Sequence, residues 1–199
     1  DGIWIGNPKK YEIALTFDDG PSADATPILL DALKKANVPA TFFVVGMRAA
    51  TAPDVVRRMA AEGHDVEDHS YSHPNLDEAL PNHIREEVLR GAVVVRALAG
   101  RWPSFFRPPG GDANPRVLQA ARQCGLAGAF WTVDAFSAEE TGSPAAVTKW
   151  VVSHARPGAI ILLHNGTASS TAAIPTMVRE LRARGYKLVT LRQLAHDAL

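Results

Sequence analysis

Segments with the pattern of β-strands alternate with segments with the pattern of α-helices along almost the whole chain. The strand-like segments are short runs of apolar residues, whereas the helix-like segments carry apolar residues at helical spacing. Asn114 followed by Pro115 is typical of the cap and first residue of a helix, and Gly63 of a helix end. The predicted strands are 12–17, 40–45, 64–68, 104–107, 127–133, 159–163 and 187–190, and the predicted helices are 25–36, 53–62, 81–98, 115–124, 144–155, 171–184 and 191–199.

About seven strands, each followed by a helix, predict a parallel sheet, because neighbouring parallel strands need helical crossovers. Such a sheet is either open or closed into a barrel, and a barrel of this length would be compact or incomplete, since barrels usually have about 250 residues. Polar residues lie at the carboxyl ends of the strands, and these ends converge on one mouth only in a barrel. We therefore predict an α/β fold, a distorted, compact (β/α) barrel with about seven parallel strands. The polar residues concerned are Asp18, Asp19, His69, Arg107, Asp134 and His164.

Length and composition indicate one domain, residues 1–199, because 199 residues with 46% hydrophobic content suit one sizeable core and are few for two domains. Lys plus Arg and Asp plus Glu both count 21, which gives no electrostatic reason for a nucleic-acid or membrane-surface partner. No apolar run reaches the roughly 18 residues that a membrane-spanning helix needs. Cys124 is the only cysteine, so no internal disulfide can form. We expect a monomer with neither nucleic acid nor membrane as partner.

Each polar residue at a strand end also has an interpretation without function. Asp18 and Asp19 before a glycine are common in turns, and His69 and His73 could lie on the surface. Their spacing nevertheless brings two imidazoles together if the chain between them turns once, as a metal site requires. His164 ends an apolar run, where a histidine is unusual. Together these residues supply a three-ligand divalent-metal site with one carboxylate left over, a combination that indicates hydrolysis.

The chain carries five short motifs, which are Thr16-Phe-Asp-Asp-Gly20, His69-Ser-Tyr-Ser-His73, Arg107-Pro-Pro-Gly-Gly111, Trp131-Thr-Val-Asp134 and Leu162-Leu-His164. They stand in the order found in the polysaccharide deacetylases, carbohydrate esterase family four, and the chain resembles that catalytic domain from residue 12 to residue 194. The resemblance implies a distorted (β/α) barrel and the metal-dependent removal of acetyl groups from a glycan.

The resemblance assigns Asp19, His69 and His73 as ligands of one divalent metal ion, zinc in the first place and cobalt or manganese as alternatives. Three protein ligands leave coordination sites open, as in catalytic rather than structural zinc sites. Asp18 matches the general base that activates the attacking water. Arg107 matches the residue that holds this base by an ion pair and keeps it ionised.

By the same resemblance, His164 is the general acid that protonates the leaving sugar nitrogen, and Asp134 is the carboxylate that steadies it. The backbone N–H of Gly110 would stabilise the oxyanion that forms on the acetyl group. Leu162, in the fifth motif, is expected to line the substrate site. Further substrate contacts are expected from three aromatic side chains that could stack on a sugar face or belong to the core, namely Tyr71, Trp131 and Phe136.

Three positions depart from the family pattern. Gly110 stands where a large residue, often tyrosine, is usual, so we expect a wider pocket. The fourth motif continues as Asp134-Ala-Phe-Ser-Ala138 and lacks a second aspartate and a tryptophan, and Phe136 is the expected substitute for the tryptophan. Asp68, beside Glu67, replaces an asparagine before the first histidine and would add negative charge or a hydrogen bond near the metal.

We therefore predict a deacetylase that hydrolyses N-acetyl groups of GlcNAc-containing glycans, either peptidoglycan or chitin oligomers, and releases acetate. The alternatives are an acetylxylan O-acetyl esterase and a catalytically impaired carbohydrate-binding homologue. The partner is an acetylated polysaccharide or oligosaccharide. We expect an extracellular or cell-envelope location, with an export segment that is not present in this sequence.

Overall fold

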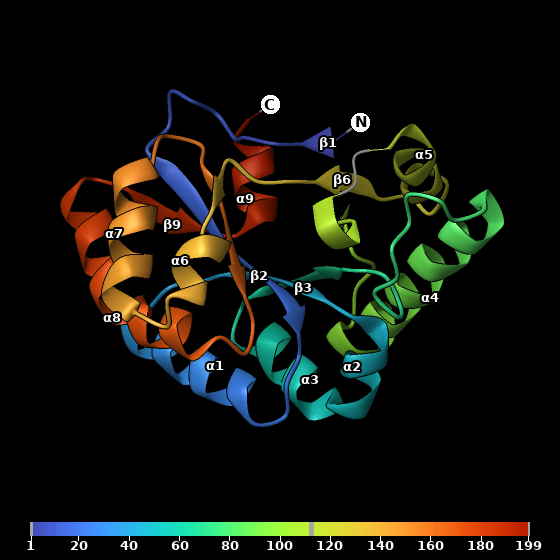
Figure 1. The fold of residues 1–199 in the computed structure, drawn as a ribbon, viewed down its shortest axis with the longest axis horizontal. Helices are drawn as coiled ribbons and strands as arrows, with labels where there is room; N and C mark the ends of the chain where they lie inside the picture. Colours follow the sequence, from blue (N-terminus) through green and yellow to red (C-terminus); the bar gives the residue numbers. More distant parts are fainter. Residues whose placement is uncertain (1, 112–113, 199) are drawn as a thin grey trace.

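A single parallel sheet forms the centre of the computed structural model, which describes residues 2–111 and 114–198 (Figure 1). Within these residues nine strands pair in the order β1-β6-β5-β4-β3-β2-β8-β7, and β9 also pairs with β2. The strands are β1 (Gly2–Ile3), β2 (Glu12–Gly20), β3 (Thr41–Val44), β4 (Asp65–Asp68), β5 (Phe105–Phe106), β6 (Ala127–Ala129), β7 (Val133–Asp134), β8 (Ile160–His164) and β9 (Lys187–Val189).

The sheet curls into a distorted barrel because one short segment reaches both of its ends. In that segment β6 pairs with β5 on one side of the sheet, and four residues after Ala129 the same chain, as β7, pairs with β8 on the other side. Between them, the Thr132 N–H donates a hydrogen bond of 3.0 Å to the Ile160 carbonyl. The carboxyl ends of β2, β4 and β8 therefore face a common mouth rather than an open edge.

Alternation along β2 separates the interior of the barrel from the outer core. Leu15 and Phe17 pack with residues of the surrounding helices in the larger apolar cluster, whereas Ala14 packs with Phe43 and Ile160 in the smaller inner cluster. Thr16 and Asp18 continue the inner face, as the two-residue period of a strand requires. The inner face of β2 thus changes from apolar to polar towards its carboxyl end.

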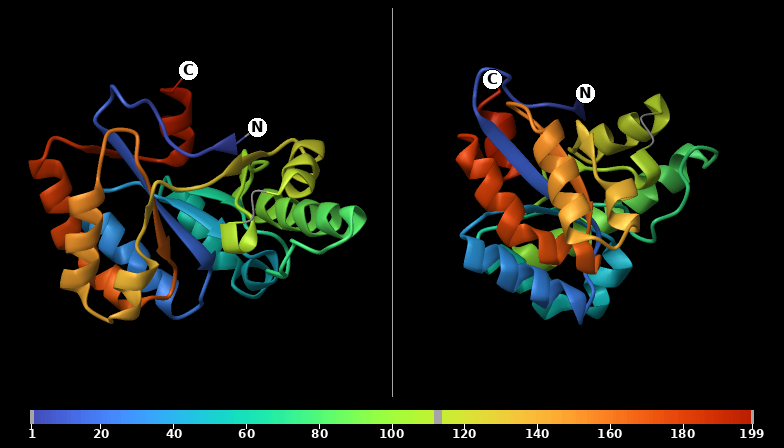
Figure 2. Two further views of the ribbon diagram at one scale, coloured as in Figure 1. Left: turned by 45° about the horizontal axis from the view of Figure 1, so that its top comes forward. Right: turned by 60° about the vertical axis from the view of Figure 1, so that its left-hand side comes forward.

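Helices enclose the sheet in two groups (Figure 2). In one group α8 packs against α1 and α7, and in the other α4 packs against α2, α3 and α5. None of the helices in the described residues is long and apolar enough to cross a membrane. The α-helices are α1 (Ala25–Ala36), α2 (Gly46–Thr51), α3 (Pro53–Ala61), α4 (Pro81–Ala99), α5 (Pro115–Gln123), α6 (Phe136–Glu140), α7 (Pro144–His154), α8 (Ala168–Ala183) and α9 (Leu191–His196), and η1 (Pro109–Gly111) is a 3₁₀ turn.

The predicted fold class is confirmed, with nine strands instead of about seven. The additional strands are β1 and β7, because β1 is too short to show a pattern and the predicted strand 127–133 divides into β6 and β7. The short helices α2 and α6 were not predicted for the same reason. Asn114 caps α5 as predicted, since its side chain accepts from the Arg116 N–H. The last residue of the predicted helix 191–199 lies outside the described residues.

Candidate active site

A β-bulge at the end of β2 brings two consecutive carboxylates to the same site. Neighbouring residues of a regular strand point to opposite faces, so Asp18 and Asp19 would normally diverge. Here Phe17 pairs with Phe42 and Gly20 with Val44, which leaves one extra residue in β2, and Asp19 has a φ of 69°. Such a bulge redirects a side chain at a local conformational cost. Both carboxylates consequently approach the same histidine, His69.

Asp19, His69 and His73 form a cluster whose ligand atoms lie within 4.8 Å of one another. The Asp19 Oδ1 atom is 3.4 Å from His69 Nε2 and 3.0 Å from His73 Nε2. Hydrogen bonds from His69 and His73 lower the pKa of the Asp19 carboxyl, which keeps it anionic. The predicted single turn between the histidines is an irregular bend, in which Ser70 and His73 both have a φ of 62°. The three predicted ligand residues thus lie together.

The orientation of His69 leaves the correct nitrogen available for a metal. Its Nδ1 atom is 2.7 Å from the Arg107 carbonyl oxygen, and because a carbonyl only accepts, Nδ1 carries the hydrogen. Nε2, which lies towards Asp19, is therefore the ring nitrogen that can give up its hydrogen and bind a metal ion. Metal-binding histidines typically donate their second N–H to a carbonyl or carboxylate in this way. The donor set and this hydrogen bond fit a divalent transition-metal ion.

Arg107 fills the barrel interior beneath Asp18. Its side chain is fully buried, and Nη1 donates to Asp18 Oδ1 at 2.7 Å and to Thr16 Oγ1 at 2.8 Å. Nη2 donates to the Phe130 carbonyl at 3.0 Å, and the guanidinium lies over the Phe43 ring at 4.0 Å. An arginine held by several elements fixes the position of its carboxylate partner. The predicted ion pair between Arg107 and Asp18 is present.

His164 is held by Glu139, not by Asp134. The His164 Nδ1 atom is 2.7 Å from Glu139 Oε2, and the His164 backbone N–H donates to Glu139 Oε1 at 2.9 Å. Ser170 also donates to the Glu139 carboxylate, which is 6% exposed. The Asp134 carboxylate instead accepts from the Phe136 N–H at 2.8 Å and starts α6. The structure thus gives Glu139, and not the predicted Asp134, as the hydrogen-bond partner of His164, while the Asp134 carboxylate is engaged at the start of α6.

Burial and nearby charge act in opposite directions on His164. Burial lowers the pKa of the imidazole, but the hydrogen bond and the charge of Glu139 raise it, together with the charges of Asp18 and Asp19. The net effect is a pKa above the usual value of histidine. Asp18 and His164 are also direct neighbours in the pairing of β2 with β8. A carboxylate and a protonatable imidazole thus stand at the same level of the barrel mouth.

The other residues predicted to contact substrate lie around this mouth in different settings. Leu162 is buried two residues before His164 on the same face of β8, and Phe136 is 50% exposed with its ring centroid 5.4 Å from that of His164. Trp131 and Tyr71 are half-buried, against Arg107 and under Arg90 respectively. Leaving out its two chain neighbours, no atom of the described residues lies within 4 Å of where a side chain of Gly110 would begin. The wider pocket expected at Gly110 stays a prediction.

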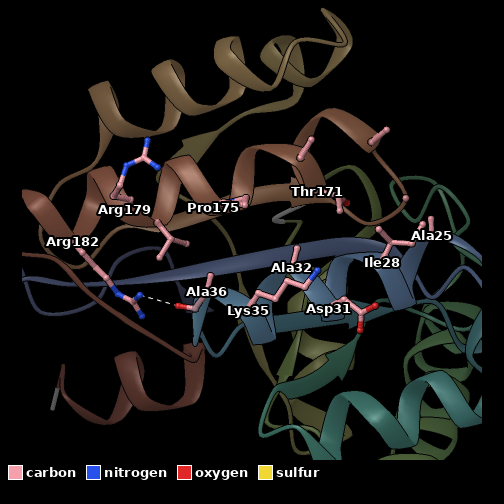
Figure 3. Close-up of a pocket in the computed structure, with 14 residues that line it drawn as sticks. Ala25, Ile28, Asp31, Ala32, Lys35, Ala36, Thr171, Pro175, Arg179 and Arg182 are labelled. Carbon is pink, nitrogen blue, oxygen red and sulfur yellow. Dashed lines mark hydrogen bonds between the residues drawn. The ribbon is translucent and has the colours of Figure 1, made fainter.

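Two cavities adjoin the cluster of Asp19 and the histidines. One, of about 330 Å³, lies between Asp19, Arg48, Phe136 and His164. The other, of about 460 Å³, extends from His73 to Gly110. A larger groove of about 960 Å³ lies between α1 and α8, and its walls combine alanine and other apolar residues with the charged side chains of Asp31, Lys35, Arg179 and Arg182 (Figure 3). Asp19 and His164 line the first of the two smaller cavities and His73 lines the second, so the candidate site adjoins these two.

Asp68 and Glu67 differ from the expectation that they add charge near the metal. Asp68 is fully buried, and burial, followed by the charge of Glu67, raises the pKa of its carboxyl well above the usual range. Burial likewise raises the pKa of Glu67 to about 7, although the Ser104 and Phe105 backbone N–H groups donate to its carboxylate. Burial therefore favours the neutral, protonated form of the Asp68 carboxyl over the negative charge that was expected.

The comparisons with known proteins agree with this geometry. A model of the polysaccharide deacetylase family matches residues 5–129. The chain belongs to this family. A peptidoglycan-N-acetylglucosamine deacetylase of Bacillus cereus is 36% identical over 190 residues, which are 94% of this chain and 69% of the relative. A chitooligosaccharide deacetylase of Bradyrhizobium is 36% identical over 197 residues, 92% of this chain and 90% of the relative. These relatives are hydrolases of amide bonds.

Relatives differ in length and in activity. A peptidoglycan-N-acetylglucosamine deacetylase of Listeria monocytogenes is 38% identical, and the chain spans 39% of its length. The solved structure of a peptidoglycan N-acetylglucosamine deacetylase in complex with 4-naphthalen-1-yl-N-oxidanyl-benzamide superposes with a TM-score of 0.91 at 35% identity, covering 97% of this chain and 92% of the other. The solved structure of a Bacillus anthracis pseudoenzyme of the same family superposes with a TM-score of 0.93 at 28% identity, covering 99% of this chain and 69% of the other. Because the fold is common to both, side chains must decide activity.

Proposed function

We propose that the chain is a metal-dependent hydrolase that removes N-acetyl groups from GlcNAc-containing glycans and releases acetate. The observation that carries this proposal is one arrangement at the barrel mouth. Asp18, which is paired with Arg107, and His164, which is paired with Glu139, lie on adjacent strands, with the Asp19, His69 and His73 cluster beside them. A base, an acid and a metal site close together are the requirements of amide hydrolysis.

The metal site would be formed by Asp19, His69 and His73. An aspartate and two histidines suit zinc, with cobalt or manganese as alternatives, and three protein ligands leave positions open. When bound, the ion would polarise the acetyl carbonyl and lower the pKa of a coordinated water. The hydrogen bond from His69 Nδ1 to the Arg107 carbonyl would keep the ligand nitrogen deprotonated and oriented.

Asp18 is the proposed general base that accepts a proton from the attacking water. Its carboxylate Oδ2 lies 3.9 Å from His69 Nε2, beside the metal site, while Oδ1 is occupied by Arg107 at 2.7 Å. One oxygen is thus fixed and the other remains available for the proton. Arg107 would hold the base in position through this ion pair.

His164 is the proposed general acid. An amine leaves an amide readily only when its nitrogen is protonated, so N-deacetylation depends on a proton donor more than ester hydrolysis does. Glu139 would raise the fraction of His164 that is protonated and would orient its Nδ1–H, so that Nε2 delivers the proton. This pair favours N-deacetylation over the O-acetyl esterase alternative.

The remaining roles concern the oxyanion and the sugar. The backbone N–H of Gly110 would stabilise the negative charge that develops on the acetyl oxygen. Phe136, the exposed ring beside His164, would contact the sugar in place of the missing tryptophan. Leu162 would form the floor of the site, and Tyr71 and Trp131 would support its walls.

Peptidoglycan and chitin oligomers are the proposed substrates, since the relatives carry those two names. A cell-envelope or extracellular location follows from peptidoglycan as substrate, and we propose that the domain acts as a monomer. The catalytically impaired alternative is less favoured because all three parts of the proposed machinery are formed in the structure.

An acetate-release panel tests the proposal. Peptidoglycan, chitin oligomers and acetylated xylan would each be incubated with the zinc-loaded protein and with the chelated protein. We expect release from at least one N-acetylated glycan, slower release from acetylated xylan, and loss of both on chelation. Faster release from acetylated xylan would favour the esterase, and no release from any substrate would support the impaired homologue.

Replacing Glu139 by glutamine should move the alkaline limb of the pH–rate profile to lower pH. The charge of Glu139 raises the pKa of His164, so its removal lowers that pKa and His164 loses its proton at lower pH. The turnover rate at the pH optimum should also fall, by less than the roughly 10²–10⁴-fold that a complete general acid contributes. The measurement is kcat/KM for a chitin oligomer against pH. Glu86→Gln is the control, because Glu86 is an exposed residue of α4 and its charge is screened by water; equal shifts in both variants would contradict the role of Glu139.

A further inference from the structure

Arg48 completes the hydrogen bonds of the bulge that carries Asp19. Three consecutive carbonyls at the end of β2 are held from three places. The Asp18 carbonyl accepts from the Asn165 N–H and the Gly20 carbonyl from the Val45 N–H, both at 2.8 Å. The Asp19 carbonyl between them accepts from Arg48 Nη1, a side chain. Arg48 thus supplies at the bulge the kind of donor that strand pairing supplies on either side.

The conformation of Asp19 makes this donor important. A φ of 69° is unfavourable for a residue other than glycine, and such conformations persist where the surroundings hold them. The same conformation directs the Asp19 carboxylate towards His69 and His73. A contact that holds the Asp19 backbone therefore also holds the position of a metal ligand.

The helix that carries Arg48 also contacts the second ligand-bearing segment. The first two N–H groups of α2, from Gly46 and Met47, donate to the carbonyls of Ser70 and Tyr71 at 2.9 and 2.8 Å. Those carbonyls lie in the bend between the two histidine ligands. The backbones approach closely here, since a Cβ on Gly46 would lie 3.2 Å from the Tyr71 Cα. The short helix α2, which follows β3 (Figure 1), thus contacts both parts of the proposed metal site.

We propose that α2 acts as a clamp between the aspartate and histidine segments of the metal site, with Arg48 as its positioning residue. The inference rests on the proposed metal site, and it assigns to Arg48 no contact with substrate. The clamp would maintain Asp19 in its ligand position before the ion binds, so the ion would not need to order the bulge. Loss of the Arg48 donor should therefore weaken metal binding.

Metal affinity of Arg48 variants tests the clamp without reference to turnover. Metal-free wild-type protein, Arg48→Met and Arg48→Lys would be titrated with Co²⁺ and with Zn²⁺, and the dissociation constants and the visible Co²⁺ spectrum recorded. Arg48→Met should bind about tenfold more weakly, as is common when a residue that supports a ligand is removed, and should change the spectrum. Arg48→Lys, which retains a cationic donor, should bind with an affinity between the two. Arg57→Met is the control, because Arg57 is an exposed arginine of α3 paired with Asp54.

Thermal unfolding of the metal-free proteins would separate positioning from general stability. Arg48→Met should remain folded with a melting temperature close to that of the Arg57→Met control. If Arg48→Met proves unfolded, Arg48→Lys alone decides, and a dissociation constant equal to that of the wild type would refute the clamp. A wild-type affinity in a folded Arg48→Met would refute it directly. Failure of the wild-type protein to bind metal would instead refute the proposed function and the clamp with it.

Discussion

Asp18→Asn should abolish most turnover and leave the metal in place. Asparagine has nearly the same shape but cannot accept the proton of the attacking water, so kcat should fall by roughly 10²–10⁴-fold. Asp18 is not one of the three clustered ligands, and Asp19, His69 and His73 are unchanged. The measurements are acetate release from a chitin oligomer and bound metal per protein. Asp54→Asn, on an exposed residue of α3, is the matched control.

The same substitution leaves Arg107 buried without its carboxylate. The guanidinium retains its hydrogen bonds to Thr16 and to the Phe130 carbonyl, and we expect a loss of unfolding free energy on the order of 2 kcal/mol, within the range for hydrogen bonds to charged groups. Activity must therefore be compared below the lower of the two melting temperatures. Wild-type turnover in a folded Asp18→Asn would eliminate Asp18 as the base.

His69→Ala should lose bound metal and, for that reason, activity. His69 is 2% exposed, and its Nε2 lies 3.4 Å from the Asp19 carboxylate, at the centre of the ligand cluster. Two remaining ligands hold an ion poorly, so we expect metal content near zero after dialysis and acetate release reduced at least 10²-fold. Metal analysis by mass spectrometry after gel filtration is the measurement.

The control for His69→Ala is His83→Ala, an exposed histidine at the start of α4. It should retain both metal and turnover. Unchanged metal content in His69→Ala would refute His69 as a ligand, whatever the effect on activity. In that case the pairing of its Nδ1 with the Arg107 carbonyl would be a structural hydrogen bond only.

The sequence is sufficient for the fold class and for the metal cluster. Alternating apolar segments predict the parallel sheet, and residues at strand ends converge because the barrel has a single mouth. The motif order then identifies Asp19, His69 and His73, which the structure brings together. These inferences depend on the order of the segments and motifs along the chain, which can be read directly from the sequence.

Local irregularities could not be predicted in the same way. A regular strand would direct Asp18 and Asp19 to opposite faces, and the sequence contains no sign of the bulge that unites them. Glu139 and Arg48 lie in helices of five and six residues, too short for a periodic pattern. The only signal for Glu139 in the sequence is its position. It is the first carboxylate after Asp134, in a motif that lacks its usual second aspartate. Tertiary contact, rather than spacing, makes it the partner of His164.

Acetate release from a chitin oligomer, measured on one preparation before chelation, after chelation and after addition of zinc, cobalt or manganese, tests the account most directly. We expect release by the loaded protein, none after the chelator, and recovery with at least one of the three ions in proportion to bound metal. Because Asp18, His164 and Glu139 are unaffected by chelation, such a result would assign the loss to the Asp19, His69 and His73 site. Release that continues at the same rate in the metal-free protein would contradict the proposed metal-dependent mechanism.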